Sequence, residues 1–181
     1  MRIGKLRGFL AAGALLALPA FAYAASSPSR AQDGSLEQKV RHQLNMLPYY
    51  GVFDNLSFRV DGDKVTLFGQ VARPVLKRDA ESAVKHIEGV RQVEDQIEVL
   101  PLSPFDNEIR VRAYRAIYGF GPLNRYVLGT HPSIHIIVKN GNLTLAGVVA
   151  NSMDRNLAYV RASGVPGAFS VNNELRVENK S

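Results

Sequence analysis

The same pattern of apolar and polar residues occurs twice in this 181-residue chain. At Lys64–Val71 the segment KVTLFGQV alternates the two kinds of residue and has a glycine two positions before its last valine. The segment NLTLAGVV at Asn142–Val149 repeats these features 78 positions later. Alternation with a period of two is typical of a half-buried strand. Each segment is therefore predicted to be the inner strand of a small domain.

The first unit is predicted to run helix, strand, strand, helix, strand. Ser35 is a candidate cap for the first helix, whose apolar residues recur at helical spacing until Pro48. Asp61-Gly62 is a hairpin signal, because glycine tolerates the positive φ of a tight turn. Pro74 suits the first turn of the second helix. The expected elements lie at residues 35–47, 56–60, 65–71, 74–88 and 93–99.

The second unit is predicted to repeat this order. Ser103 and Pro104 begin its first helix, and an extended loop at residues 118–132 follows. Pro166 cannot lie inside a helix, so the second helix is expected to end by Ser163 or Gly164. The expected elements lie at residues 104–117, 134–138, 143–149, 152–163 and 169–177. The offset of 78 holds without a gap from the first strand to the last, which indicates a duplication.

Two glycines in each unit occupy equivalent places. Gly69 matches Gly147, and Gly89 matches Gly167. Their spacing fits neither a dinucleotide-binding glycine motif nor a P-loop. Glycine inside a strand commonly marks a close backbone approach. We therefore expect these residues to serve packing rather than ligand binding.

The N-terminus has the features of an export signal. Basic residues precede the apolar run at residues 9–18, and Ala22-Tyr23-Ala24 is a cleavage site of the A-x-A kind. A transmembrane anchor is the alternative, but the run is short for a hydrocarbon layer of about 30 Å. Residues 1–24 are thus predicted to be a signal peptide cleaved after Ala24, and residues 25–34 a flexible tail. The mature protein is expected in the periplasm.

Charge differs between the two units. The whole chain has a formal net charge of +6, but three basic residues lie in the predicted signal, which leaves +3. Residues 35–101 have a net charge of −1, and residues 102–178 have +3. Any electrostatic attraction to an anionic partner is therefore expected from the second unit.

The segments VTLFGQV at residues 65–71, GVRQV at 89–93 and IEV at 97–99 resemble the BON domain. The second copy is similar to it less closely, with Gly167-Ala168-Phe169 where the family favours Gly-Val. The resemblance implies an α+β fold of two tandem αββαβ domains, each with two helices packed on a three-stranded mixed sheet. The domains are expected at residues 35–101 and 103–178.

The resemblance also implies a non-enzymatic envelope protein similar to the osmotically inducible periplasmic proteins. It implies binding of phospholipid at the membrane surface and a part in envelope stress. A periplasmic chaperone or scaffold that binds exported proteins is the alternative. The chain has no cysteine, so it lacks the lipid-anchoring residue of the lipoprotein members, and any membrane contact is expected to be peripheral.

No motif predicts catalysis, a cofactor or a metal. His131 and His135 are the only histidines with ligand-like spacing, and no cysteine or carboxylate cluster completes a zinc site. Asp61 and Asp63 lack the later glutamate of a calcium loop. We expect no enzymatic activity, and export makes nucleic acid an unexpected partner.

Arginine and aromatic residues are interleaved at residues 110–126, where the two copies differ most. Basic side chains attract anionic headgroups, and aromatic rings settle at the membrane interface. The alternative is a solvated basic helix face with its tyrosines in the core. The hypothesis of a lipid contact names Arg110, Arg112, Arg115, Tyr118, Phe120, Arg125 and Tyr126.

Overall fold

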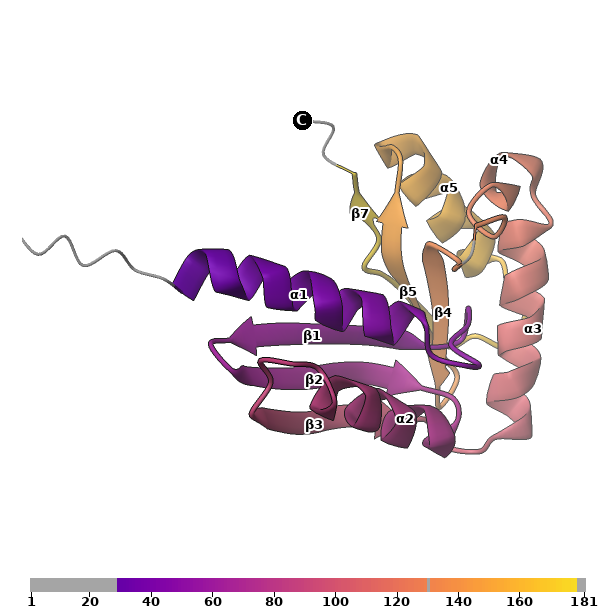
Figure 1. The fold of residues 1–181 in the computed structure, drawn as a ribbon. Helices are drawn as coiled ribbons and strands as arrows, with labels where there is room; N and C mark the ends of the chain where they lie inside the picture. The colour runs from indigo at the N-terminus through magenta and orange to yellow at the C-terminus, as the bar shows by residue number, and fades with distance from the viewer. Residues whose placement is uncertain (1–28, 130, 179–181) are drawn as a thin grey trace, which may run out of the picture.

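The computed structural model describes residues 29–129 and 131–178, which form two domains of the α+β class (Figure 1). The predicted signal peptide at residues 1–24 and residues 25–28 of the predicted tail lie outside this range. The two mixed sheets and the helices that cover them confirm the predicted fold class of two tandem αββαβ domains.

The first domain places two helices on one face of a three-stranded sheet. Apolar residues of both helices and of the central strand share one core. The central strand is antiparallel to the strand before it and parallel to the strand after it, so the sheet is mixed. The elements are α1 (Ser29–Asn45), β1 (Asn55–Asp61), β2 (Lys64–Val71), α2 (Pro74–Lys85) and β3 (Gln92–Val99).

Helix α1 begins six residues earlier than predicted. It starts at Ser29, so Ser35 lies inside the helix and does not cap it, and residues 29–34 are helical rather than a flexible tail. No proline lies between residues 29 and 47, and the single Gly34 costs a helix interior only about 1 kcal/mol. The buried stripe that includes Val40 and Leu44 holds the helix on the sheet.

The second domain has the same order with two changes. A one-turn helix lies in the loop predicted at residues 118–132, and the third strand is divided into two segments that both pair in parallel with the central strand. Ser103 caps the first helix as predicted, since its Oγ accepts from the Asp106 N–H at 3.1 Å. The elements are α3 (Pro104–Tyr118), α4 (Gly121–Asn124), β4 (Ile134–Lys139), β5 (Asn142–Val149), α5 (Ser152–Ser163), β6 (Ser170–Asn173) and β7 (Arg176–Val177).

The third strand is interrupted where an asparagine side chain accepts a hydrogen bond from the backbone two residues later. The Oδ1 atom of Asn173 accepts from the Leu175 N–H at 3.2 Å, and Leu175 is buried. The equivalent Asp95 accepts from the Ile97 N–H at 2.9 Å, yet β3 is continuous there. The strand predicted at residues 169–177 is thus divided into β6 and β7 in the second domain, although the same bond leaves β3 continuous in the first.

Gly69 and Gly147 permit a close approach between strands, as predicted. Their φ angles are 113° and 116°, a region that side chains disfavour. A Cβ atom would lie 1.9 Å from the carbonyl oxygen of Asn55 at Gly69, and 2.1 Å from that of Ser133 at Gly147. The matching geometry supports the duplication and assigns both glycines to packing.

The two domains meet through the loop that precedes β1. The backbone carbonyl of Val52 accepts from the Ile136 N–H at 2.7 Å, so the loop lies along the free edge of β4. Val52 and Phe53 also pack against the core of the second domain. The strands of the second sheet run across the direction of the first (Figure 1). The relative orientation of the domains could not be predicted from the sequence, because this loop contact joins distant residues.

Candidate functional site on the second domain

Two residues of the lipid hypothesis are buried at the edge of β4. Arg110 is 6% exposed, and its Nη2 donates to the carbonyl oxygen of Val138 at 2.7 Å. Tyr118 is 2% exposed, and its hydroxyl donates to the carbonyl oxygen of Ile134. Burial raises the pKa of Tyr118 and lowers that of Arg110. Both side chains satisfy an otherwise unpaired strand edge, so they do not form a surface for lipid.

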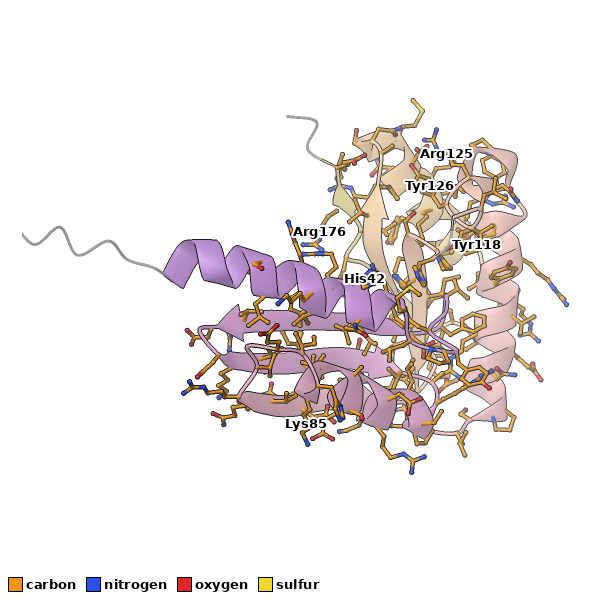
Figure 2. All side chains as sticks on the ribbon, in the orientation of Figure 1. His42, Lys85, Tyr118, Arg125, Tyr126 and Arg176 are labelled. Carbon is orange, nitrogen blue, oxygen red and sulfur yellow. The ribbon has the colours of Figure 1, made fainter. Side chains whose placement is uncertain are left out.

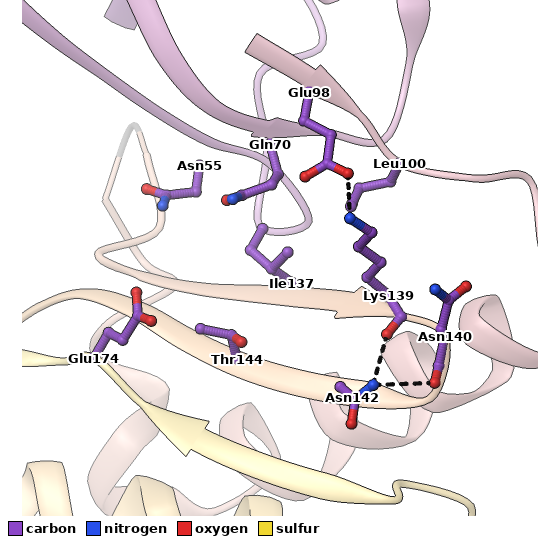
Figure 3. A pocket seen from close by; sticks show the side chains of 10 residues that line it. All are labelled: Asn55, Gln70, Glu98, Leu100, Ile137, Lys139, Asn140, Asn142, Thr144 and Glu174. Carbon is purple, nitrogen blue, oxygen red and sulfur yellow. Dashed lines mark hydrogen bonds and ion pairs between the residues drawn. The ribbon is translucent and has the colours of Figure 1, made fainter. Parts of the chain in front are cut away.

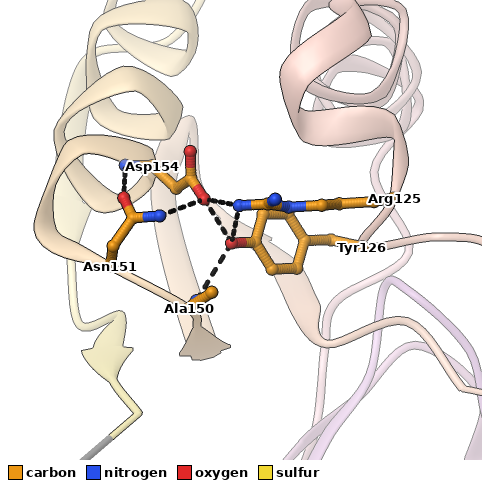
Figure 4. A network of polar contacts seen from close by, with 5 residues as sticks. All are labelled: Arg125, Tyr126, Ala150, Asn151 and Asp154. Atoms are coloured by element: carbon orange, nitrogen blue, oxygen red, sulfur yellow. Dashed lines mark hydrogen bonds and ion pairs between the residues drawn. The ribbon is translucent and has the colours of Figure 1, made fainter.

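Tyr126 is also buried, within a polar network at the start of α5 (Figure 4). Its hydroxyl donates to Asp154 and accepts from the Ala150 N–H at 2.9 Å. Arg125 forms an ion pair with the same carboxylate, and Asn151 caps α5 by accepting from the Asp154 N–H at 2.8 Å. The network ties the loop after α4 to α5, so the role of Tyr126 is structural.

The electrostatics of this network favour an ionised Asp154. Burial acts to raise the pKa of its carboxyl group, but hydrogen bonds from Tyr126 and Arg125 outweigh burial and lower it. Arg125 keeps about half of its side chain exposed, at 54%. Figure 2 shows Tyr118, Arg125 and Tyr126 together in the second domain, near α4. Of these three residues, only Arg125 reaches the surface.

The other predicted residues lie on the outer side of α3 or next to it. Arg112 and Arg115 are exposed, and Arg112 pairs with Glu108 at 2.8 Å. Phe120 is partly buried against the core, and the guanidinium of Arg161 lies 4.9 Å from its ring centroid. Arg112, Arg115 and Arg125 thus remain candidates for contact with an anionic surface. The alternative, a solvated basic helix face with buried tyrosines, describes Tyr118 and Tyr126 correctly.

Helix α5 has an apolar outer face that the sequence reasoning missed. Met153 is 76% exposed and Val160 is 63% exposed, and they line a shallow groove with Leu157, which is itself partly buried against the core. The spacing of these three residues places them on one face of the helix. Arg161 lies between this face and α3, because its Nε donates to the carbonyl oxygen of Ala116 at 3.0 Å. We call Met153, Leu157 and Val160 the α5 stripe.

A comparison of α5 with the equivalent helix α2 of the first repeat could have predicted this stripe. At the offset of 78, Leu157 corresponds to Asp79 and Val160 to Ser82, so polar positions of α2 are apolar in α5. A second difference lies at the adjoining strand. Lys77 pairs with Asp95 in the first domain, whereas Arg155 faces the uncharged Asn173 at the equivalent place. Arg155 forms no ion pair with any residue that the structure describes.

The histidine pair belongs to the domain contact. The rings of His131 and His135 both lie against Tyr50, with centroids 5.9 and 5.6 Å away. His135 is buried, which lowers its pKa, and its Nδ1 lies 3.3 Å from the carbonyl oxygen of Gly51. Within residues 29–129 and 131–178, no group of three or more histidine, cysteine or acidic residues has the geometry of a metal site.

The fold and its repeated strands agree with a comparison against protein families. The family model described as the BON domain matches residues 32–101 and 123–179, more than half of the chain. The chain belongs to the BON domain family. BON is a family of non-catalytic binding domains, known in envelope-associated proteins. The match to two segments also confirms the predicted tandem repeat, and α3 lies outside the second matched segment.

Two solved structures show what else the chain is similar to. Both come from CdsD of Chlamydia trachomatis, described as a structural protein of the type III secretion system. One is 12% identical, covers 80% of this chain and 94% of its own, and has a TM-score of 0.31. The other, of the C-terminal domain, is 13% identical, covers 79% and 97%, and has a TM-score of 0.28. No curated protein matches the chain.

Proposed function

We propose that this protein is an exported, non-enzymatic envelope protein whose second BON domain binds anionic phospholipid at a membrane surface. The observation that carries the proposal is the α5 stripe, where Leu157 and Val160 replace the polar Asp79 and Ser82 of the equivalent helix. Exposed apolar residues on one helix face are costly in water and mark an interaction surface. Their burial among acyl chains would recover that cost.

Arginines surround the stripe and supply the attraction to anionic headgroups. Arg155 and Arg161 lie on α5, and Arg112 and Arg115 on the outer side of α3, which packs beside α5. Of the acidic residues in these two helices, Asp106 and Asp154 are buried and Glu108 pairs with Arg112. Each arginine near an anionic surface contributes about 1 kcal/mol, so the outer helical layer favours such a surface over a neutral one.

Peripheral attachment agrees with the described part of the chain. None of the helices in residues 29–129 and 131–178 is long and apolar enough to cross a membrane. The export signal predicted at residues 1–24 supports a periplasmic location. The part in osmotic or envelope stress that the family resemblance implies stays a prediction.

Liposome flotation of the mature protein tests the proposal. Binding is expected with anionic vesicles at low salt, and weaker binding is expected at high salt or with neutral vesicles. Val160→Ser, which copies Ser82 of α2, is expected to reduce binding several-fold. Arg115→Gln is expected to reduce it about fivefold. Arg78→Gln on the exposed side of α2 is the matched control and is expected to leave binding unchanged.

Two outcomes would contradict lipid binding at this surface. The first is no flotation with anionic vesicles at low salt. The second is flotation that Val160→Ser, Arg115→Gln and Arg78→Gln weaken equally, because general electrostatic adsorption would then explain it. If the protein instead prevented aggregation of an unfolded client without lipid, the chaperone alternative would be favoured.

A further inference from the structure

The helix-free faces of the two sheets form a cleft between the domains (Figure 3). Its volume is ≈ 330 Å³, and an adjoining hollow lined by Tyr50 and His135 shares Asn55 and Glu174 with it. Asn55 and Gln70 are direct neighbours on β1 and β2, so their side chains enter the cleft from the same face of the first sheet. Thr144 of β5 lines the opposite side.

Amide and hydroxyl side chains, which can both donate and accept hydrogen bonds, make up half of this lining. The side chains of Asn55, Gln70, Asn140 and Thr144 make no hydrogen bond to any other described residue. Amides and hydroxyls match ligands that themselves carry both donors and acceptors. The cleft is thus equipped for a ligand rich in hydroxyl and amide groups.

The charges that line the cleft and the adjoining hollow, taken together, balance one another. Glu98 and Lys139 form an ion pair across the two domains at 2.5 Å. Glu174 lies in both hollows, and Arg176 lines the adjoining one. Because neither sign is in excess, the lining favours a neutral ligand over an anionic headgroup. This separates the cleft from the arginine-rich outer layer of α3 and α5.

An exposed aromatic ring continues the same face. Phe68 lies two residues before Gln70 on β2, on the same side of the sheet and about 7 Å away along the strand. It is 38% exposed, although Ser57 and Gln96 flank it. The face of an aromatic ring carries partial negative charge and attracts the C–H bonds of a sugar ring. Polar groups in a cleft with an aromatic platform beside them fit an extended sugar chain.

We propose that this cleft and Phe68 bind a neutral oligosaccharide that carries hydroxyl and acetamido groups. Asn55 and Gln70 hold it from the first domain, and Thr144 from the second. Sugar rings beyond the cleft stack on Phe68. Because both domains contribute, bound sugar also holds the two sheets in one relative position. The inference is independent of lipid binding, which uses the opposite, helix-covered side of the second domain.

The test is a titration of the mature protein with tetra-N-acetylchitotetraose, followed by NMR and calorimetry. Shift changes are expected to centre on residues 55, 68, 70 and 144. Gln70→Ala and Thr144→Val are each expected to weaken binding about three- to tenfold, the effect of losing one hydrogen bond. Phe68→Ala is expected to weaken it to a similar degree. Gln43→Ala on the exposed face of α1 is the matched control.

The outcomes distinguish binding of a neutral sugar from binding of a peptide or of an anionic sugar. No binding at millimolar sugar would overturn it, as would binding that Gln70→Ala and Gln43→Ala leave equally intact. Binding of tetra-alanine that competes with the sugar would assign the cleft to peptides instead. Equally strong binding of an anionic sugar, oligogalacturonate, would contradict the inferred preference for a neutral ligand. Unchanged NMR spectra of the ligand-free variants outside the mutated site would show that each variant is folded.

Discussion

The guanidinium of Arg110 donates from Nη2 to the backbone carbonyl of Val138 at 2.7 Å. Val138 is one of three β4 residues whose outward backbone groups are satisfied by other parts of the chain. The hydroxyl of Tyr118 donates to the carbonyl oxygen of Ile134, and the carbonyl oxygen of Val52 accepts from the Ile136 N–H. An unpaired strand edge is a template for aggregation, so these contacts protect β4. Arg110 is therefore a structural residue of a basic helix.

Arg110→Met is expected to destabilise the protein without weakening lipid binding. The substitution keeps apolar volume but removes the charged donor to Val138, which is worth about 2 kcal/mol. Urea unfolding measures the loss, and flotation of the folded variant measures lipid binding. Arg115→Gln is expected to behave in the opposite way, with unchanged stability and weaker binding. Equal effects of the two variants on flotation would show that Arg110 contacts lipid.

Tyr126→Phe is expected to lower the free energy of unfolding by about 1–3 kcal/mol. The phenyl ring fills the same space, but the Ala150 N–H and the Asp154 carboxylate each lose a hydrogen-bond partner. Thermal and urea unfolding measure the effect. Tyr159→Phe is the matched control, because Tyr159 is 43% exposed on α5. A loss as large for Tyr159→Phe would contradict the importance of the buried network.

Asp154 is expected to make stability fall in acid. Its pKa in the folded state is lowered from an ordinary value of 3.8, so its contribution is present above that value. The contribution is lost as the pH falls through the folded-state pKa. The difference in free energy of unfolding between the wild type and Asp154→Asn is therefore expected to shrink below about pH 4. A difference that stays constant from pH 7 to pH 2.5 would contradict this.

Burial of His135 is expected to lower the free energy of unfolding as the pH falls below neutral. Burial lowers its pKa in the folded state below the ordinary 6.5, so the unfolded chain binds a proton first as the pH falls. Stability then declines below about pH 6.5 until the folded-state pKa is passed. His135→Phe keeps a ring against Tyr50 and is expected to reduce this slope. Unfolding curves between pH 5 and pH 8 test it, and identical slopes would contradict it.

Gly69→Ala is expected to prevent stable folding of the first domain or to cost about 3 kcal/mol or more. The added Cβ would lie 1.9 Å from the Asn55 carbonyl oxygen, at a φ of 113°. Gly62→Ala separates the two causes, because Gly62 also has a positive φ but has no atom within 4 Å of the added Cβ. It is expected to cost only about 1–2 kcal/mol. Similar losses for both would rule out the steric contact as the main cause.

The α-helical stripes, alternating strands and turns could be predicted because their signals are local. Pro104 and Ser103 begin α3, and Asn140-Gly141 turns the second hairpin with both residues at positive φ. The start of α1 was missed because Ser35 offers a cap that the longer helix does not need. The α5 stripe was missed because helical spacing alone does not say which apolar face meets the core.

The sequence by itself determined the duplication and the order of the main helices and strands, because these depend on spacing along the chain, and its motifs carried the resemblance to the BON domain. Only the tertiary structure decided which arginines and tyrosines face solvent. Arg110 and Arg112 are two positions apart on α3, and residues at that spacing point to different sides of a helix. The first is buried against β4 and the second is exposed. The position of β4 relative to α3 makes that difference, and it is set by contacts between residues distant in the chain.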